Sequence, residues 1–181
     1  MSSALALPAV TAALATIVQE AVDGCGLTPR PLVTTGPLDA GGADTAAVVH
    51  LYRVTSDPSL AANALPARVA GDDPTQRPRI ALNLHYLIAF GGPSDLVAQQ
   101  LLAATALALH VEPVLTASRF AAAEAAYPQI AGSGLEAMRE PLRVISNTLP
   151  LDELIRMWAV YPPGSSRLTL AVSCGPVIIS G

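Results

Sequence analysis

The residues best suited to hold a metal or to act in catalysis are His50, His85, His110, Cys25 and Cys174. A zinc site needs closely spaced ligands, such as His-Glu-x-x-His on one helix or paired cysteines. This sequence has neither arrangement, so we predict no metal site and no bound cofactor. His50 and His85 both alternate with apolar residues in expected strands and could meet on neighbouring strands. We expect them to be hydrogen-bonded sheet residues, and a small-molecule pocket beside them is the alternative.

Acidic and hydroxyl side chains offer no other arrangement for catalysis. Asp72-Asp73 lies in a polar stretch, and Asp152-Glu153 lies at the start of an expected helix, where the helix dipole favours negative charge. Gly132-Ser133-Gly134 lacks the lysine of a phosphate-binding loop, and the chain has no Gly-x-Ser-x-Gly nucleophile elbow. We therefore predict no catalytic residues and no enzymatic activity.

The composition indicates a protein that acts through its surface. The length of 181 residues suits one domain, 1–181, and only 13% of the residues are charged although 51% are hydrophobic. Soluble domains usually have about twice that charged fraction. The longest apolar runs are shorter than the roughly 18 residues that span a membrane, so we expect no integral membrane insertion. We expect a soluble subunit that buries apolar surface against copies of itself or a partner.

The charged residues also bear on possible partners. The formal net charge is −4, lysine is absent, and the ten arginines are scattered along the chain. A nucleic-acid-binding protein needs a clustered basic surface to neutralise phosphates. We therefore expect no nucleic-acid partner.

Hydrophobic periodicity predicts the elements that must position these residues. Ser94 or Asp95 is expected to cap the second main helix, whose wide apolar stripe indicates little solvent exposure. Strands 46–54 and 79–90 are apolar on both faces and should be central. The expected elements are helices over 7–22, 95–110 and 151–160, and strands over 46–54, 79–90, 141–147 and 167–179.

Three segments leave a choice. Residues 32–34 form a brief strand or an extended connection, and 112–134 contains a short helix over 118–126 or a mobile excursion. Gly175-Pro176 interrupts the last strand, and because proline cannot donate to a ladder, we expect an edge position or a bulge there. Together the elements predict an α+β fold, with a mixed or antiparallel sheet of about four to five strands covered by two main helices.

A set of residues along the chain occurs in the order and spacing of a known family. These residues are Tyr52, Arg53, Leu82, Leu84, His85, Tyr86, Gly91, Leu101, Leu102, Leu151, Leu154 and Trp158. The set resembles the cap, or tail-terminator, proteins of extracellular phage-tail-like contractile injection systems, in their N-terminal domain, and the similarity covers roughly residues 5–180. Two features depart from the family's pattern, namely Ala103, where the family tends to have glycine, and the Gly175-Pro176 interruption, and 117–131 has no clear match.

The resemblance implies a tail-terminator-like fold and a structural function without cofactors. It implies a homo-oligomeric ring, hexameric in this family, on the baseplate-distal end of the particle. The partners would be the terminal inner-tube ring and the terminal sheath ring, whose growth the cap would stop. Assembly would take place in the cytoplasm, where Cys25 and Cys174 are expected to be free thiols, and the particle would be released by lysis.

We expect the ring or filament contact to involve strand addition at a sheet edge. The first candidate edge is the closing strand, with Leu168, Leu170, Val172, Val177 and Ile179, and the second is Leu32–Thr35. Two other functions stay open from the sequence. One is an adaptor that attaches the particle to a membrane or another complex through the polar loop 56–78, and the other is a small-molecule-binding protein or enzyme with a pocket near His50 and His85.

Overall fold

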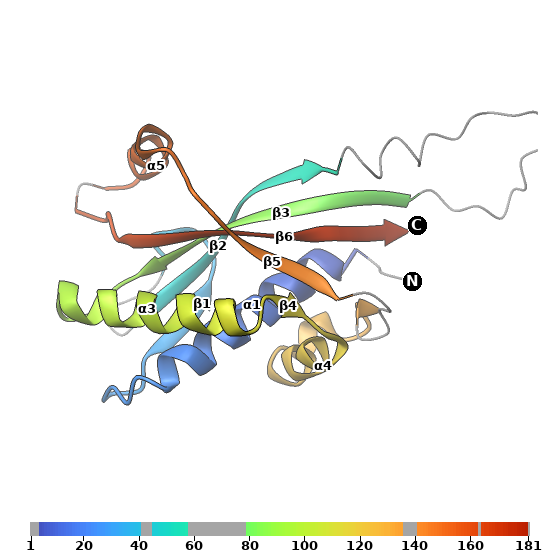
Figure 1. Ribbon diagram of the computed structural model, residues 1–181, viewed down its shortest axis with the longest axis horizontal. Helices are drawn as coiled ribbons and strands as arrows, with labels where there is room; N and C mark the ends of the chain where they lie inside the picture. The colour runs from blue at the N-terminus through green and yellow to red at the C-terminus, as the bar shows by residue number, and fades with distance from the viewer. Residues whose placement is uncertain (1–3, 41–44, 58–78, 136–140, 163, 181) are drawn as a thin grey trace, which may run out of the picture.

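The computed structural model describes residues 4–40, 45–57, 79–135, 141–162 and 164–180 of the chain. It has an α+β fold, as predicted, with helices packed on one mixed sheet (Figure 1). The elements in chain order are α1 (Ala6–Asp23), β1 (Leu32–Thr35), β2 (Thr45–Ser56), β3 (Arg79–Phe90), α3 (Asp95–Val111), β4 (Val114–Leu115), α4 (Ala117–Ala126), the 3₁₀-helix η1 (Pro128–Ile130), β5 (Leu142–Asn147), α5 (Leu151–Trp158) and β6 (Leu168–Ser180).

The described sheet has six strands in the order β1-β2-β3-β6-β5-β4. Only β1 and β2 are parallel, and the other neighbours are antiparallel. This arrangement confirms a mixed sheet in which β2 and β3 are central. The sequence predicts four to five strands, and the difference includes β4, whose two residues are too few to produce a recognisable alternation.

Most of the core lies between one face of the sheet and helices α1, α3 and α4 (Figure 1). Small buried residues such as Ala9 and Ala13 let α1 approach closely, and Leu84 and Ile88 of β3 belong to the same cluster. Among the described helices, α1 is long and apolar enough to cross a membrane, but more than half of it is buried inside the fold. Its apolar residues are therefore used by the core.

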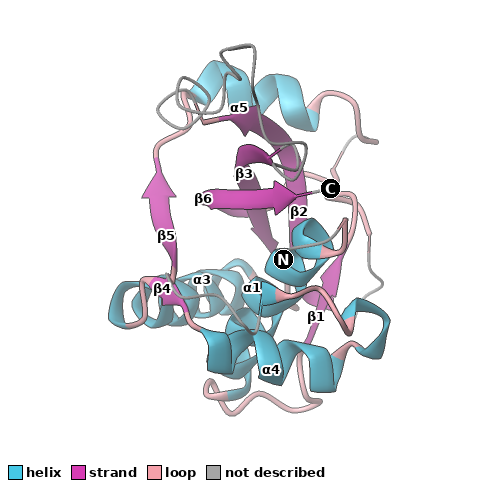
Figure 2. Cartoon of the chain, turned by 90° about the vertical axis from the view of Figure 1, so that its right-hand side faces the viewer, coloured by secondary structure: helices cyan, strands magenta, loops and turns pink. Residues whose placement is uncertain are grey.

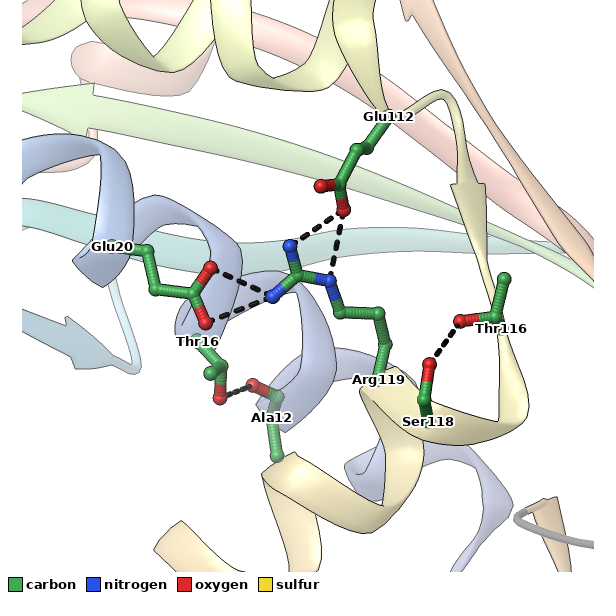
Figure 3. Close-up of polar contacts among 7 residues, drawn as sticks. All are labelled: Ala12, Thr16, Glu20, Glu112, Thr116, Ser118 and Arg119. Atoms are coloured by element: carbon green, nitrogen blue, oxygen red, sulfur yellow. Dashed lines mark hydrogen bonds and ion pairs between the residues drawn. The ribbon is translucent and has the colours of Figure 1, made fainter.

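Three ionic side chains join α4 to α1 and to the end of α3 (Figure 3). Arg119 Nη1 lies 2.7 Å from Glu20 Oε2, and Arg119 Nη2 lies 2.6 Å from Glu112 Oε2. Hydrogen bonds to Glu112 and Glu20 raise the pKa of the Arg119 guanidinium above its ordinary value. Of the two alternatives for this segment, the short helix is correct, and this contact fixes its position.

The position of β6 corrects the prediction that the closing strand is a sheet edge. β6 lies between β3 and β5, and residues 171–174 are paired on both sides. Val172 is fully buried, opposite Tyr86 on β3 and Ser146 on β5. The middle of this strand therefore has no free edge for a partner strand.

The interruption in β6 is a bulge, which is the other alternative that the sequence left open. Leu82 pairs with Val177 and Leu84 with Cys174, so Asn83 faces both Gly175 and Pro176. A Cβ on Gly175 would overlap the Asn83 side chain and would lie 3.1 Å from the carbonyl oxygen of Leu82. Glycine permits this close approach, and the bulge accommodates the proline that lacks an N–H.

Candidate assembly surfaces

Most residues that carry the family resemblance pack inside the fold. The Gly91 N–H donates to the Ala46 carbonyl at 2.9 Å, at the end of the β2–β3 pair. The Tyr86 hydroxyl lies 2.9 Å from Thr11 Oγ1, and burial raises the pKa of Tyr86 well above its ordinary value. The motif positions that belong to or pack against the main core are Leu82, Leu84, Tyr86, Leu101 and Leu102. These residues position the surfaces and are not themselves offered to a partner.

A second apolar cluster lies on the opposite face of the sheet, below α5. Leu154 and Trp158 of α5, together with Tyr52 of β2, pack against buried Leu87 and Ala171. Trp158 also lies against Tyr161, with ring centroids 5.6 Å apart. This is the packing role that the helical spacing predicts for Trp158. The third motif residue of α5, Leu151, points outward instead and is 71% exposed.

The two candidate histidines are bonded to different partners. His50 Nδ1 lies 2.8 Å from the Gly36 carbonyl oxygen, and His85 Nε2 lies 3.0 Å from Thr55 Oγ1. Two surface hollows of the described chain, one along α1 and one at the start of α3, are lined by neither histidine. In the described residues no group of three or more His, Cys, Asp or Glu side chains could hold a metal ion. The arrangement fits hydrogen-bonded sheet histidines.

His85 predicts a measurable pH dependence of stability. The pKa of His85 lies below its ordinary value, mainly because the ring is partly buried and also because the positive charge of Arg53 is near. In an unfolded chain the pKa of histidine is about 6.5. The unfolded chain therefore binds more protons once the pH falls below that value, so acidification destabilises the fold until His85 itself is protonated. We expect His85→Gln to lose less stability than the wild type between pH 7.5 and 5 in urea denaturation. Equal losses would contradict this role of His85.

The free edge at β1 is partly occupied by a side chain. Gln19 of α1 donates through Nε2 to the Pro31 carbonyl and accepts through Oε1 from the Val33 N–H, both at 2.9 Å. A partner strand would need these backbone groups. This reduces the backbone available for the strand addition expected at Leu32–Thr35. At the other edge, β4 pairs only with Leu142 and Arg143 of β5.

The exposed side of α3 presents large apolar side chains together with the uncharged amides of Gln99 and Gln100. The sequence predicts little exposure for this helix, but Leu96, Leu107 and Val111 are 76%, 64% and 69% exposed. Between Asp95 and Glu112 the helix has no Asp, Glu, Lys or Arg, and its one titratable side chain is that of His110. We call the exposed side chains of Leu96, Ala103, Leu107 and Val111 the α3 face. The wide stripe seen in the sequence thus covers both the core and an exposed surface.

An apolar groove of about 350 Å³ runs between α1, β1, β2 and η1. Leu7, Thr11, Thr35 and Gln129 are among its lining residues, and none of the residues that line it is charged. Figure 2 shows α3 and β5 on one side of the molecule and β1 on the other. We call this hollow the α1–η1 groove, and none of its lining residues belongs to α3.

The chain is similar to one protein family and to a solved structure. A family model described as the Pvc16 N-terminal domain matches residues 9–181. Among solved structures, the chain is similar to a PVC sheath/tube terminator of an extracellular contractile injection system in the extended state, with a TM-score of 0.45 and 19% identity over 90% of this chain and 54% of that chain. The chain thus spans about half the length of the solved protein. No curated protein matches its sequence.

Proposed function

Because the chain belongs to the Pvc16 N-terminal domain family and its sequence resembles cap proteins, we propose that it is a structural terminator subunit of a contractile injection system. In this proposal, copies of the chain form a ring, hexameric as the resemblance implies, on the baseplate-distal end of the particle. The ring contacts the last inner-tube ring and the last sheath ring and stops both from growing. It assembles in the cytoplasm as part of a particle that lysis releases.

The family match over almost the whole chain is the observation that carries this proposal. The surface is consistent with it, because a ring subunit hides large areas against its neighbours and against the filament, and interface cores are depleted in charged residues. A terminator acts by surface complementarity and needs no catalytic group. The exposed apolar residues on α3 and α5 fit a function of this kind.

The two alternatives gain no comparable support. The adaptor hypothesis rests on the loop 56–78, of which 58–78 lies outside the described residues. The pocket hypothesis needs His50 and His85 to share a site, whereas each is hydrogen-bonded to a partner of its own. We therefore retain the terminator as the proposed function.

The proposed function predicts a ring that blocks filament growth. We expect the purified protein to have a single mass, six times that of the chain, by native mass spectrometry. Added to assembling tube and sheath proteins, it should shorten the filaments seen by electron microscopy, and labelled protein should be found at one end only. Heat-unfolded protein at the same concentration is the control. Unchanged filament lengths together with labelling along the sides would contradict the proposal.

A further inference from the structure

The α3 face carries the strongest sign of a missing contact in the described part of the chain. A surface helix normally presents charged or polar residues to water. The α3 face instead presents Leu96, Leu107 and Val111, each more than 60% exposed, over about four turns in which the exposed polar residues are Gln99, Gln100 and His110. Apolar patches of this kind mark interaction sites.

The α1–η1 groove supplies a recess formed by elements other than α3. Its lining includes the aliphatic side chains of Leu7, Leu51 and Ile130, and its rim carries uncharged polar side chains such as Thr35 and Gln129. Protruding leucine and valine side chains match this recess in chemical character. A contact that joins two different patches of the same chain is heterologous, and heterologous contacts close into rings when the rotation between neighbours permits.

The charge distribution favours a second copy of this chain as the occupant. Every copy has a formal net charge of −4, so two copies repel each other unless the surfaces in contact carry no charge or opposite charges. Both the α3 face and the lining of the groove lack carboxylates. A contact between them brings no acidic groups together.

We propose that the α3 face of one subunit packs into the α1–η1 groove of the next. Leu107 and Val111 are the large side chains in the C-terminal half of the α3 face, and the exposed Thr35 and Gln129 line the groove. The inference deepens the proposed function, because it names the surfaces through which the ring would close. It would hold for a ring of any order.

Complementary half-blocked variants test the contact directly. Leu107→Glu places a charge on the α3 face, and the double variant Thr35→Glu/Gln129→Glu places charges at the groove. All three residues are exposed, so both variants should keep the wild-type unfolding midpoint. Ala121→Glu, on the exposed side of α4, is the matched control for an added negative charge. The masses of each protein and of an equimolar mixture are measured by sedimentation velocity and native mass spectrometry.

We expect the wild type and Ala121→Glu to form rings, and each blocked variant to be a single subunit with association weakened at least tenfold. The mixture should give 1:1 pairs and nothing larger. In each pair the intact α3 face of one variant binds the intact groove of the other, so that only the two blocked surfaces stay free. The proposal is overturned if the wild type is a single subunit, if either blocked variant or the mixture forms full rings, if the mixture stays unpaired, or if the control also loses its rings.

The same variants separate this contact from the terminator function. A Leu107→Glu protein that keeps its rings but no longer binds filament ends would assign the α3 face to the tube or sheath and overturn the proposed contact. A wild type that forms rings, and whose half-blocked variants pair as expected but which leaves filament growth unchanged, would support the contact and contradict the terminator function.

Discussion

Val172→Pro is expected to unfold the protein, not to release a folded subunit from its ring. Val172 is fully buried in β6, and its neighbours are Tyr86 on β3 and Ser146 on β5. Proline removes a ladder hydrogen bond and fixes the backbone in the middle of a sheet, and it also loses the packing of the valine side chain. The backbone carbonyl left without a donor should cost about 1 to 3 kcal/mol, and the lost side-chain packing and the altered backbone add to this loss.

The measurement is urea denaturation followed by circular dichroism, with Val172→Ala as the matched control. Alanine keeps the N–H, so it should lose only side-chain packing, about 1 to 3 kcal/mol. A Val172→Pro protein that is as stable as Val172→Ala would mean that β6 can detach from its neighbours, as an edge strand would. A folded Val172→Pro subunit that fails to form rings would restore the closing strand as an assembly edge.

The long periodic elements were predictable from the sequence because their patterns depend on local geometry alone. The 7–22 helix and the 79–90 strand are examples, since each repeats its apolar spacing over many residues. The neighbours of β6 were not predictable, because strand pairing is a long-range property. Gly175-Pro176 is compatible with an edge or with a bulge, and only the opposite strand, with Asn83 facing both residues, decides between them.

The candidate surfaces were predictable only in part. The sequence marks Leu82, Leu84 and Tyr86 as family-motif positions, and in the structure all three belong to or pack against the main core. For α3, the absence of charge from Leu96 to Val111 is visible in the sequence. The same apolar pattern is typical of a fully buried helix, and only the position of the sheet and α1 shows that one side of α3 is left exposed.

The contact between Gln19 and β1 is another feature that could not be predicted from the sequence. A glutamine on a helix and an extended segment starting 13 residues later have no detectable relation in the sequence, yet the side-chain amide occupies two backbone groups at the edge of the sheet. Edge strands in natural proteins are commonly protected in some way against unwanted pairing. We therefore favour helix packing over strand addition at this side of the subunit.

Tyr86→Ala is expected to cause the second large loss of stability, about 3 to 5 kcal/mol, as for other large aromatic side chains removed from a core. The Tyr86 ring is fully buried between β3 and α1, and its hydroxyl donates to Thr11 Oγ1, which itself donates to the Leu7 carbonyl at 3.2 Å. Tyr86→Phe keeps the ring, and Thr11 keeps its bond to Leu7, so this control should lose only about 0.5 to 1.5 kcal/mol. Both losses are measured as free energies of unfolding in urea. Similar losses in the two variants would mean that the hydroxyl, not the ring, holds α1 on the sheet, whereas the expected gap would make ring packing the larger contribution of Tyr86.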